Sequence, residues 1–277
     1  MSRTSLFLLL LLMQPGIAHA SRISSSSNYL HKKPAVFQIK AVPSNNSSAI
    51  DYAISQADAA MRGNEAERAL RILQHYAERN PDSEPLVIAQ AKALDALNKT
   101  ADSVDLLRKY LARIPNSIRA RACLADLYFL QGQFRLSRQT FIESLKQTNT
   151  HTEHDADDSF VFYRLAQISA IDGDLDQSLH YLKDCLELYP SYFPAHLLTA
   201  RIYAARNQLK EANASYAKCF DLDKANPAVL TELASILALQ GKTLDAVERL
   251  LRAHKEEPAS VDIVQMFITI YGVWEDW

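Results

Sequence analysis

A pattern of 34 residues repeats three times without a gap over residues 159–260, and it constrains this chain more than any other feature. Small residues recur at places 8 and 20 of each copy, so that two antiparallel helices can approach closely. These are Ala166, Ala200 and Ala234 at place 8, and Ser178, Ala212 and Ala246 at place 20. Glycine at place 15 favours a turn, and proline at place 32 ends a helix. A fixed period of this length predicts a helical repeat array.

Counting back in the same register extends the pattern to Ile50. Every proline in the array falls at place 1, 2 or 32, where a helix begins or ends. Residues 152–158 interrupt the array, and residues 261–277 predict a single closing helix. We therefore expect six helix–turn–helix repeats, at residues 50–83, 84–117, 118–151, 159–192, 193–226 and 227–260.

The columns of this pattern resemble the tetratricopeptide repeat (TPR) family. The third repeat resembles it most, with Leu124 and Ala125 at places 7 and 8, Tyr128 at place 11, Gly132 at place 15 and Phe141 at place 24. The resemblance implies an all-α, right-handed superhelical solenoid that binds a protein or peptide partner in a concave groove. The predicted chain is also similar in architecture to TPR accessory proteins of pilus assembly and envelope secretion. This similarity implies a scaffold or adaptor in such a complex.

In the TPR family the groove is lined by first-helix side chains at about places 2, 5, 9, 12 and 13. Transferred column by column, the charged, amide and aromatic candidates are Lys92, Arg119, Asp126, Phe129, Phe160, Tyr163, Gln167 and Arg201. Aromatic and arginine side chains usually contribute most of the binding energy, so we expect most from Phe129, Tyr163 and Arg201. The alternative is that some of the aromatic residues pack within the array.

The closing helix is unusually apolar. A polar stripe of Asp262, Gln265 and Thr269 is expected on its groove side, and Val264, Phe267, Ile268 and Tyr271 are expected to pack backwards. This arrangement leaves five apolar residues without predicted cover: Ile263, Met266, Ile270, Val273 and Trp274. An uncovered apolar patch usually marks a contact, so one interpretation is a docking or self-association surface. The other is that this end folds over the last repeat.

Residues 1–20 have the pattern of a secretory signal peptide. Arg3 precedes a short apolar run at residues 6–13, and Ala18 and Ala20 flank the expected cleavage end. The run is much shorter than the roughly 20 apolar residues of a spanning helix, which disfavours the alternative of an uncleaved anchor. Residues 21–49, rich in Ser, Asn and Pro, predict a flexible leader. We expect export, to the bacterial periplasm or, alternatively, by secretion.

Composition and motifs favour a scaffold over an enzyme. A net charge of −2 and a pI near 6.4 give no strong field for nucleic acid. No catalytic motif is present and the array histidines do not converge, so we expect no catalysis, cofactor or metal. The alternative is a metal- or redox-linked factor. It would use the His- and Asp-rich residues 149–158 or one of three thiols: Cys123, Cys185 and Cys219.

Overall fold

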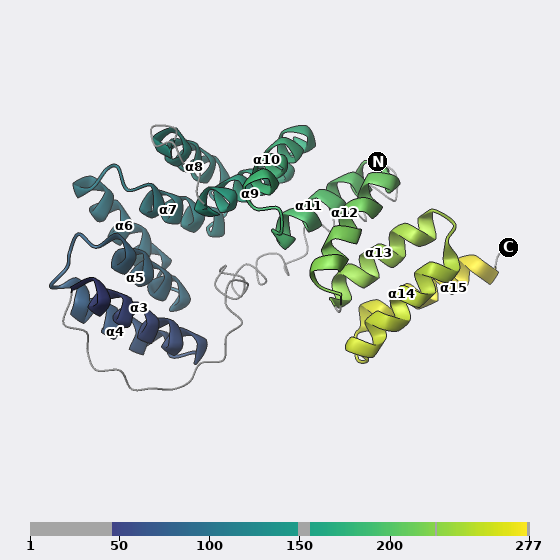
Figure 1. Cartoon of the computed structure of the whole chain (residues 1–277), viewed down its shortest axis with the longest axis horizontal. Helices are drawn as coiled ribbons and strands as arrows, with labels where there is room; N and C mark the ends of the chain where they lie inside the picture. Colours follow the sequence, from purple (N-terminus) through teal and green to yellow (C-terminus); the bar gives the residue numbers. More distant parts are fainter. Residues whose placement is uncertain (1–45, 149–155, 225, 276–277) are drawn as a thin grey trace. The chain divides into compact units, whose positions relative to one another are not determined.

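The computed structural model describes the backbone of residues 46–148, 156–224 and 226–275, and contains thirteen helices and no strand within them (Figure 1). The all-α prediction is therefore confirmed. The helices form two compact units, each considered separately. The expected signal peptide, nearly all of the leader and most of residues 149–158 lie outside the described residues. Among the described helices, none is both long and apolar enough to cross a bilayer.

The amino-terminal unit consists of three helix pairs. Its helices are α3 (Asn46–Arg62), α4 (Ala66–Ala77), α5 (Glu84–Ala96), α6 (Thr100–Arg113), α7 (Ile118–Leu130) and α8 (Phe134–Thr148). Successive first helices, α3 with α5 and α5 with α7, contact each other. The core lies between the helices of each pair and between neighbouring pairs, where Leu73, Leu86 and Leu107 are almost completely buried.

The carboxyl-terminal unit continues the same architecture and ends on an unpaired helix. It contains α9 (Ala156–Ile171), α10 (Leu175–Leu188), α11 (Phe193–Ala205), α12 (Leu209–Leu222), α13 (Pro227–Leu239), α14 (Thr243–Glu256) and α15 (Val261–Glu275). Leu182, Leu230 and Leu250 are buried at the centre of its two apolar clusters. The last helix, α15, packs on α13 and α14.

The small residues at places 8 and 20 meet across each helix pair. In three repeats the place-20 serine hydroxyl donates to the place-8 alanine carbonyl at 2.8 Å. These bonds join Ser103 to Ala91, Ser137 to Ala125, and Ser178 to Ala166. Such a bond requires the side chain of one helix to touch the backbone of the other. Close helix approach is therefore the physical reason that these two columns hold small residues.

Turn and cap residues set the helix ends. Six residues with positive φ are found in the described part of the chain, and each occupies place 15 of its repeat: Asn64, Asn98, Gly132, Gly173, Asn207 and Gly241. Glycine adopts this left-handed conformation without steric cost, and asparagine tolerates it better than most residues. Serine, aspartate and asparagine side chains cap α7, α10 and α13, and proline occupies the first turn of α5, α11 and α13.

Candidate functional site

The first helices of the amino-terminal unit carry exposed charges at the candidate groove places. Lys92 on α5 and Arg119 on α7 are exposed, whereas Asp126 and Phe129 on α7 are half-buried. The ring of Phe129 stands edge-on to Phe134, with ring centroids 5.5 Å apart. This surface therefore combines charges of both signs with one aromatic side chain, Phe129, that packs against Phe134.

Cys123 lies among the charges of this surface. Burial raises the pKa of its thiol to about 12, while Lys92 acts to lower that pKa and Asp126 and Asp95 act to raise it. The three charges on α5 and α7 are thus close enough to act on one thiol. Asp95 also accepts a hydrogen bond from Thr100 Oγ1 at 2.8 Å. Lys92 forms no ion pair within the part of the chain that the structure describes.

A shallow hollow lies on α3 of the same unit, with a volume of about 230 Å³. Its lining residues fall on one face of the helix and include the groove places of the first repeat: Asp51, Ile54, Ser55, Asp58 and Arg62. Asp51, Asp58 and Arg62 are exposed. The hollow therefore offers a partner one apolar side chain surrounded by polar and charged groups.

In the carboxyl-terminal unit the candidate Arg201 is already bound within the protein. Its guanidinium on α11 donates Nε to Glu232 Oε2 at 2.9 Å and Nη2 to Glu232 Oε1 at 2.5 Å. Tyr216 on α12 donates its hydroxyl to the same Oε2 at 2.7 Å. The Arg201 and Glu232 side chains are only 17% and 12% exposed. Sequence reasoning missed Glu232 and Tyr216, which hold Arg201 in place.

The electrostatics of this cluster follow from its burial. Burial alone would lower the pKa of Arg201. The hydrogen bonds that Arg201 donates to Glu232, together with the negative charge of Glu232, instead raise this pKa above its ordinary value. Burial, followed by the charge of Glu232, raises the pKa of Tyr216 well above its usual range. Both donors therefore keep their protons at neutral pH, and Glu232 accepts three hydrogen bonds from them.

The other candidates of this unit also pack internally. Gln167 is 7% exposed and accepts a hydrogen bond from Arg164 Nη1 at 2.9 Å, so the expectation that it faces a partner is wrong. The Arg164 guanidinium lies over the Phe160 ring, 5.1 Å from its centroid. Tyr163 stands edge-on to Tyr192 at 5.3 Å. The groove candidates on α9 thus contribute to internal packing.

The predicted exposure of the closing helix is wrong for two residues. Ile263 and Ile270 are 2% and 5% exposed and belong to the core formed with α13 and α14. Met266 is half-buried against the same core, and its sulfur lies 3.5 Å from Ser235 Oγ. The side chains of Val273 and Trp274 lie outside the described residues. Ile263 and Ile270 are buried because they occupy places 3 and 10 of the 34-residue pattern. Val229 and Ile236 occupy the same places of the preceding repeat and are also buried.

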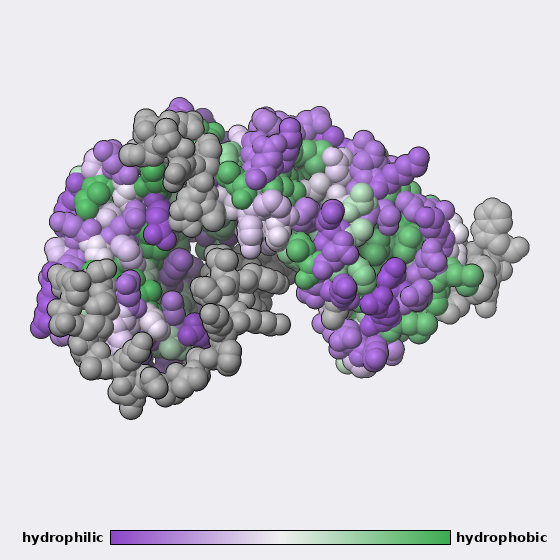
Figure 2. Space-filling view, in the orientation of Figure 1, coloured by the Kyte–Doolittle hydropathy of each residue, from purple (hydrophilic) through white to green (hydrophobic). Residues whose placement is uncertain are grey.

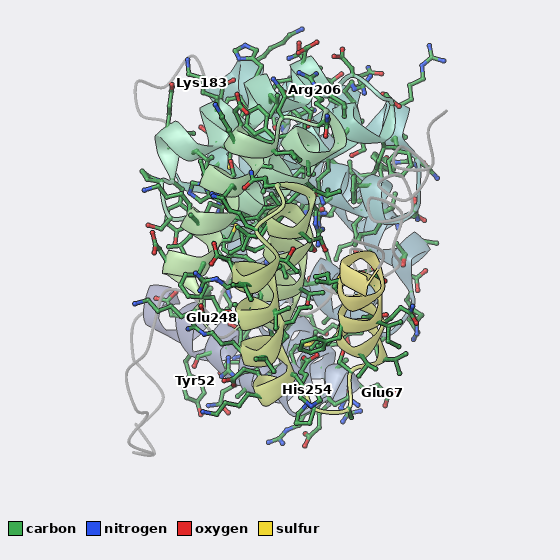
Figure 3. The ribbon with its side chains drawn as sticks, turned by 90° about the vertical axis from the view of Figure 1, so that its right-hand side faces the viewer. Tyr52, Glu67, Lys183, Arg206, Glu248 and His254 are labelled. Carbon is green, nitrogen blue, oxygen red and sulfur yellow. The ribbon has the colours of Figure 1, made fainter. Side chains whose placement is uncertain are left out.

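A different face of α15 is open to solvent. Val264 and Ile268 are 45% and 60% exposed, although the sequence predicted that they pack backwards. No second helix covers them within the residues that the structure describes. Apolar side chains, including Leu244 and Leu251 of α14, reach the surface at this end (Figure 2). His254 of α14, which is labelled in Figure 3, packs edge-on against Phe267 of α15, with ring centroids 6.4 Å apart.

The metal- or redox-linked alternative depends on residues 149–158 and on three thiols. The described residues contain no group of three or more His, Cys, Asp or Glu side chains placed to hold a metal ion. The two histidines of residues 149–158, together with Glu153 and Asp155, fall outside them. The three cysteines are free, and burial raises the pKa of the Cys185 and Cys219 thiols to about 12. Thiols with such pKa values are poor nucleophiles near neutral pH.

Comparison with known proteins finds a family match for one repeat of this chain. Residues 161–192 match the model of the tetratricopeptide repeat. Human tetratricopeptide repeat protein 21B is 33% identical over 61 residues, which are 22% of this chain and 5% of that protein. The chain therefore spans a small fraction of this curated relative.

Solved structures show the same fold at low sequence identity. Pseudomonas aeruginosa PilF has a TM-score of 0.68 at 17% identity, over 81% of this chain and 99% of PilF. PilW, described as a widely conserved type IV pilus biogenesis factor, has a TM-score of 0.67 at 19% identity, over 79% and 98%. YrrB, described as a TPR protein with an unusual peptide-binding site, has a TM-score of 0.54 at 18% identity, over 70% and 96%. With its 34-residue period, its paired helices and one repeat that matches the family model at residues 161–192, this chain has the tetratricopeptide repeat fold.

Proposed function

We propose that this chain is a non-enzymatic scaffold that binds a peptide segment of a partner protein on the first helices of its amino-terminal unit. The observation that carries this proposal is the exposed Lys92 ammonium, which has no ion-pair partner among the described residues. An exposed charge of this kind can pair with a ligand without first breaking an internal ion pair. YrrB, a protein of the same fold, is described as having a peptide-binding site.

The difference between the two units supports this assignment. In the carboxyl-terminal unit, Arg201 is hydrogen-bonded to Glu232, and Gln167 is hydrogen-bonded to Arg164. A ligand that used these groups would have to break those internal bonds. In the amino-terminal unit, Lys92 and Asp58 remain exposed at the corresponding place 9. We therefore propose that the amino-terminal unit recognises the partner, while these groups of the carboxyl-terminal unit serve its internal stability.

Site-specific photocrosslinking in cells tests this proposal. A photoreactive amino acid at position 92 should crosslink to a partner, because this exposed position lies on the proposed binding surface. The matched control is position 105, which is also exposed and lies on the second helix of the same repeat. The partner should be absent from the control and should be lost from position 92 in an Asp58→Lys, Arg119→Glu background that retains its helical content. A partner captured equally at both positions would contradict the assignment.

We further propose that this scaffold works in the periplasm of a Gram-negative bacterium, in assembly of a pilus or another envelope secretion complex. The signal-peptide pattern of residues 1–20 supports export. PilW, which shares the fold, is described as a type IV pilus biogenesis factor. A fold can host many functions, so the pathway rests on this analogy together with the export pattern.

Cleavage of the first 20 residues is the testable part of this setting. Intact mass analysis of the protein from the periplasmic fraction of a Gram-negative host should give a chain that begins at Ser21. An Ala18→Lys, Ala20→Lys variant should keep these residues, because the cleavage site requires small side chains. Full-length protein recovered only from the cytoplasm would refute export.

A further inference from the structure

A cavity of about 390 Å³ opens in the amino-terminal unit, away from the groove places of the first helices. It lies between the end of α4, the first half of α5 and the second half of α6. Its lining includes Leu86 and Val87 of α5 and Leu106 and Tyr110 of α6. Ligand pockets commonly have volumes from about 300 to 1,000 Å³ and are largely apolar. The cavity can hold one large apolar side chain and some of its backbone.

Gln90 is the unusual residue of this cavity. It occupies place 7, where the third, fourth and sixth repeats hold the buried residues Leu124, Leu165 and Leu233. Gln90 is 8% exposed and lines the cavity, and it has no hydrogen-bond partner within the described part of the chain. The amide nitrogen and oxygen are not themselves fully buried, so they are open to the solvent in the cavity. An amide that opens into an apolar cavity is therefore suited to pair with a peptide backbone.

Two residues that line the cavity, Arg113 and Lys109, are positively charged. Arg113 is held by Asp82, with Nη1 3.1 Å from Oδ1, and donates Nη2 to the Pro81 carbonyl at 3.0 Å. Lys109, one helical turn earlier on α6, is exposed and forms no ion pair within the described residues. The ammonium of Lys109 thus favours a ligand with a negative charge next to its apolar group.

We propose that this cavity is an anchor pocket for an extended peptide of a partner protein, in which a large apolar residue is followed closely by Asp or Glu. The apolar side chain fills the space above Leu86 and Val87. The Gln90 amide pairs with the peptide backbone, and Lys109 pairs with the acidic side chain. This second recognition point is built from different residues than the surface around Lys92, and it does not depend on that surface being used.

Selection from a phage-displayed random peptide library against the purified chain tests the proposal. The wild-type chain should enrich peptides in which an apolar residue precedes Asp or Glu. Lys109→Glu should instead enrich Lys or Arg at that position, because it reverses the charge of a residue that lines the cavity. Ala77→Phe, which narrows the cavity from the end of α4, should remove the apolar preference. A library that yields no apolar–acidic motif would overturn the proposal.

The Gln90→Leu variant separates binding from folding. It restores the apolar residue found at place 7 of other repeats, so its midpoint of thermal unfolding should equal or exceed that of the wild type. Its affinity for an enriched peptide should nevertheless fall about tenfold, because the hydrogen-bonding amide is lost. Lys92→Glu serves as the control and should leave this affinity unchanged. Binding that survives Gln90→Leu, or that is lost in Lys92→Glu, would show that the peptide lies elsewhere.

Discussion

Replacing Glu232 with alanine is expected to lower the free energy of unfolding by about 3 kcal/mol. The change leaves the Arg201 guanidinium without its bidentate acceptor and removes the acceptor of the Tyr216 hydroxyl. Both Arg201 and Glu232 are largely buried, so water cannot fully replace the lost bonds. Denaturant unfolding of the wild type and of Glu232→Ala, followed by circular dichroism, measures the difference.

A double variant provides the control for this prediction. In Arg201→Met, Glu232→Leu both charges are removed together, and apolar side chains of similar size take their place. Because the cost of a broken buried pair comes mainly from the charge left behind, the double variant should lose only about 1 kcal/mol, chiefly because the Tyr216 hydroxyl is left without its acceptor. If Glu232→Ala were as stable as the double variant, Arg201 would not be a buried charge that depends on Glu232.

The same cluster changes how the binding surface should be tested. Arg201→Glu, a natural choice for removing a groove arginine, would place a second carboxylate against Glu232 in a largely buried site. Two like charges at hydrogen-bond distance are strongly destabilising, so lost binding in such a variant would reflect lost structure. Lys92 is the better position, because its exposed ammonium has no internal ion pair to break within the described residues.

The fold could be predicted from the sequence because the same local sequence signals recur at the same places of successive repeats. Small residues at places 8 and 20, such as Ala166 and Ser178, predict close helix pairs, and the hydrogen bond between them shows that closeness. Glycine at place 15 predicts a turn, and Gly173 has a positive φ of 84°. These signals act within about 12 residues, so a single sequence is sufficient to read them.

The candidate site was harder to predict because its contacts cross from one repeat to the next. Arg201 and Glu232 are 31 residues apart, and a column assignment gives the direction of a side chain without naming its partner. The burial of Ile263 could have been found, since Val229 occupies the same place of the preceding repeat and is also buried. Gln90 gave a signal as well, because it is a polar residue in a column that three other repeats fill with leucine.

Substitutions at place 8 of two different helices test most directly whether this place must be small for two helices to approach closely. Ala234 occupies place 8 of the sixth repeat, is fully buried, and lies in one cluster with Ala246 of α14. Ala234→Ile adds three carbon atoms where the two helices touch, and overpacking of this kind costs about 3 kcal/mol. Ile268 occupies the same place on α15 but is 60% exposed, so Ile268→Ala should change stability by less than about 0.5 kcal/mol. Thermal unfolding should therefore show a midpoint lowered by roughly 6–12 °C for Ala234→Ile and nearly unchanged for Ile268→Ala. Equal shifts in the two variants would mean that place 8 is small for a reason other than the contact with a second helix.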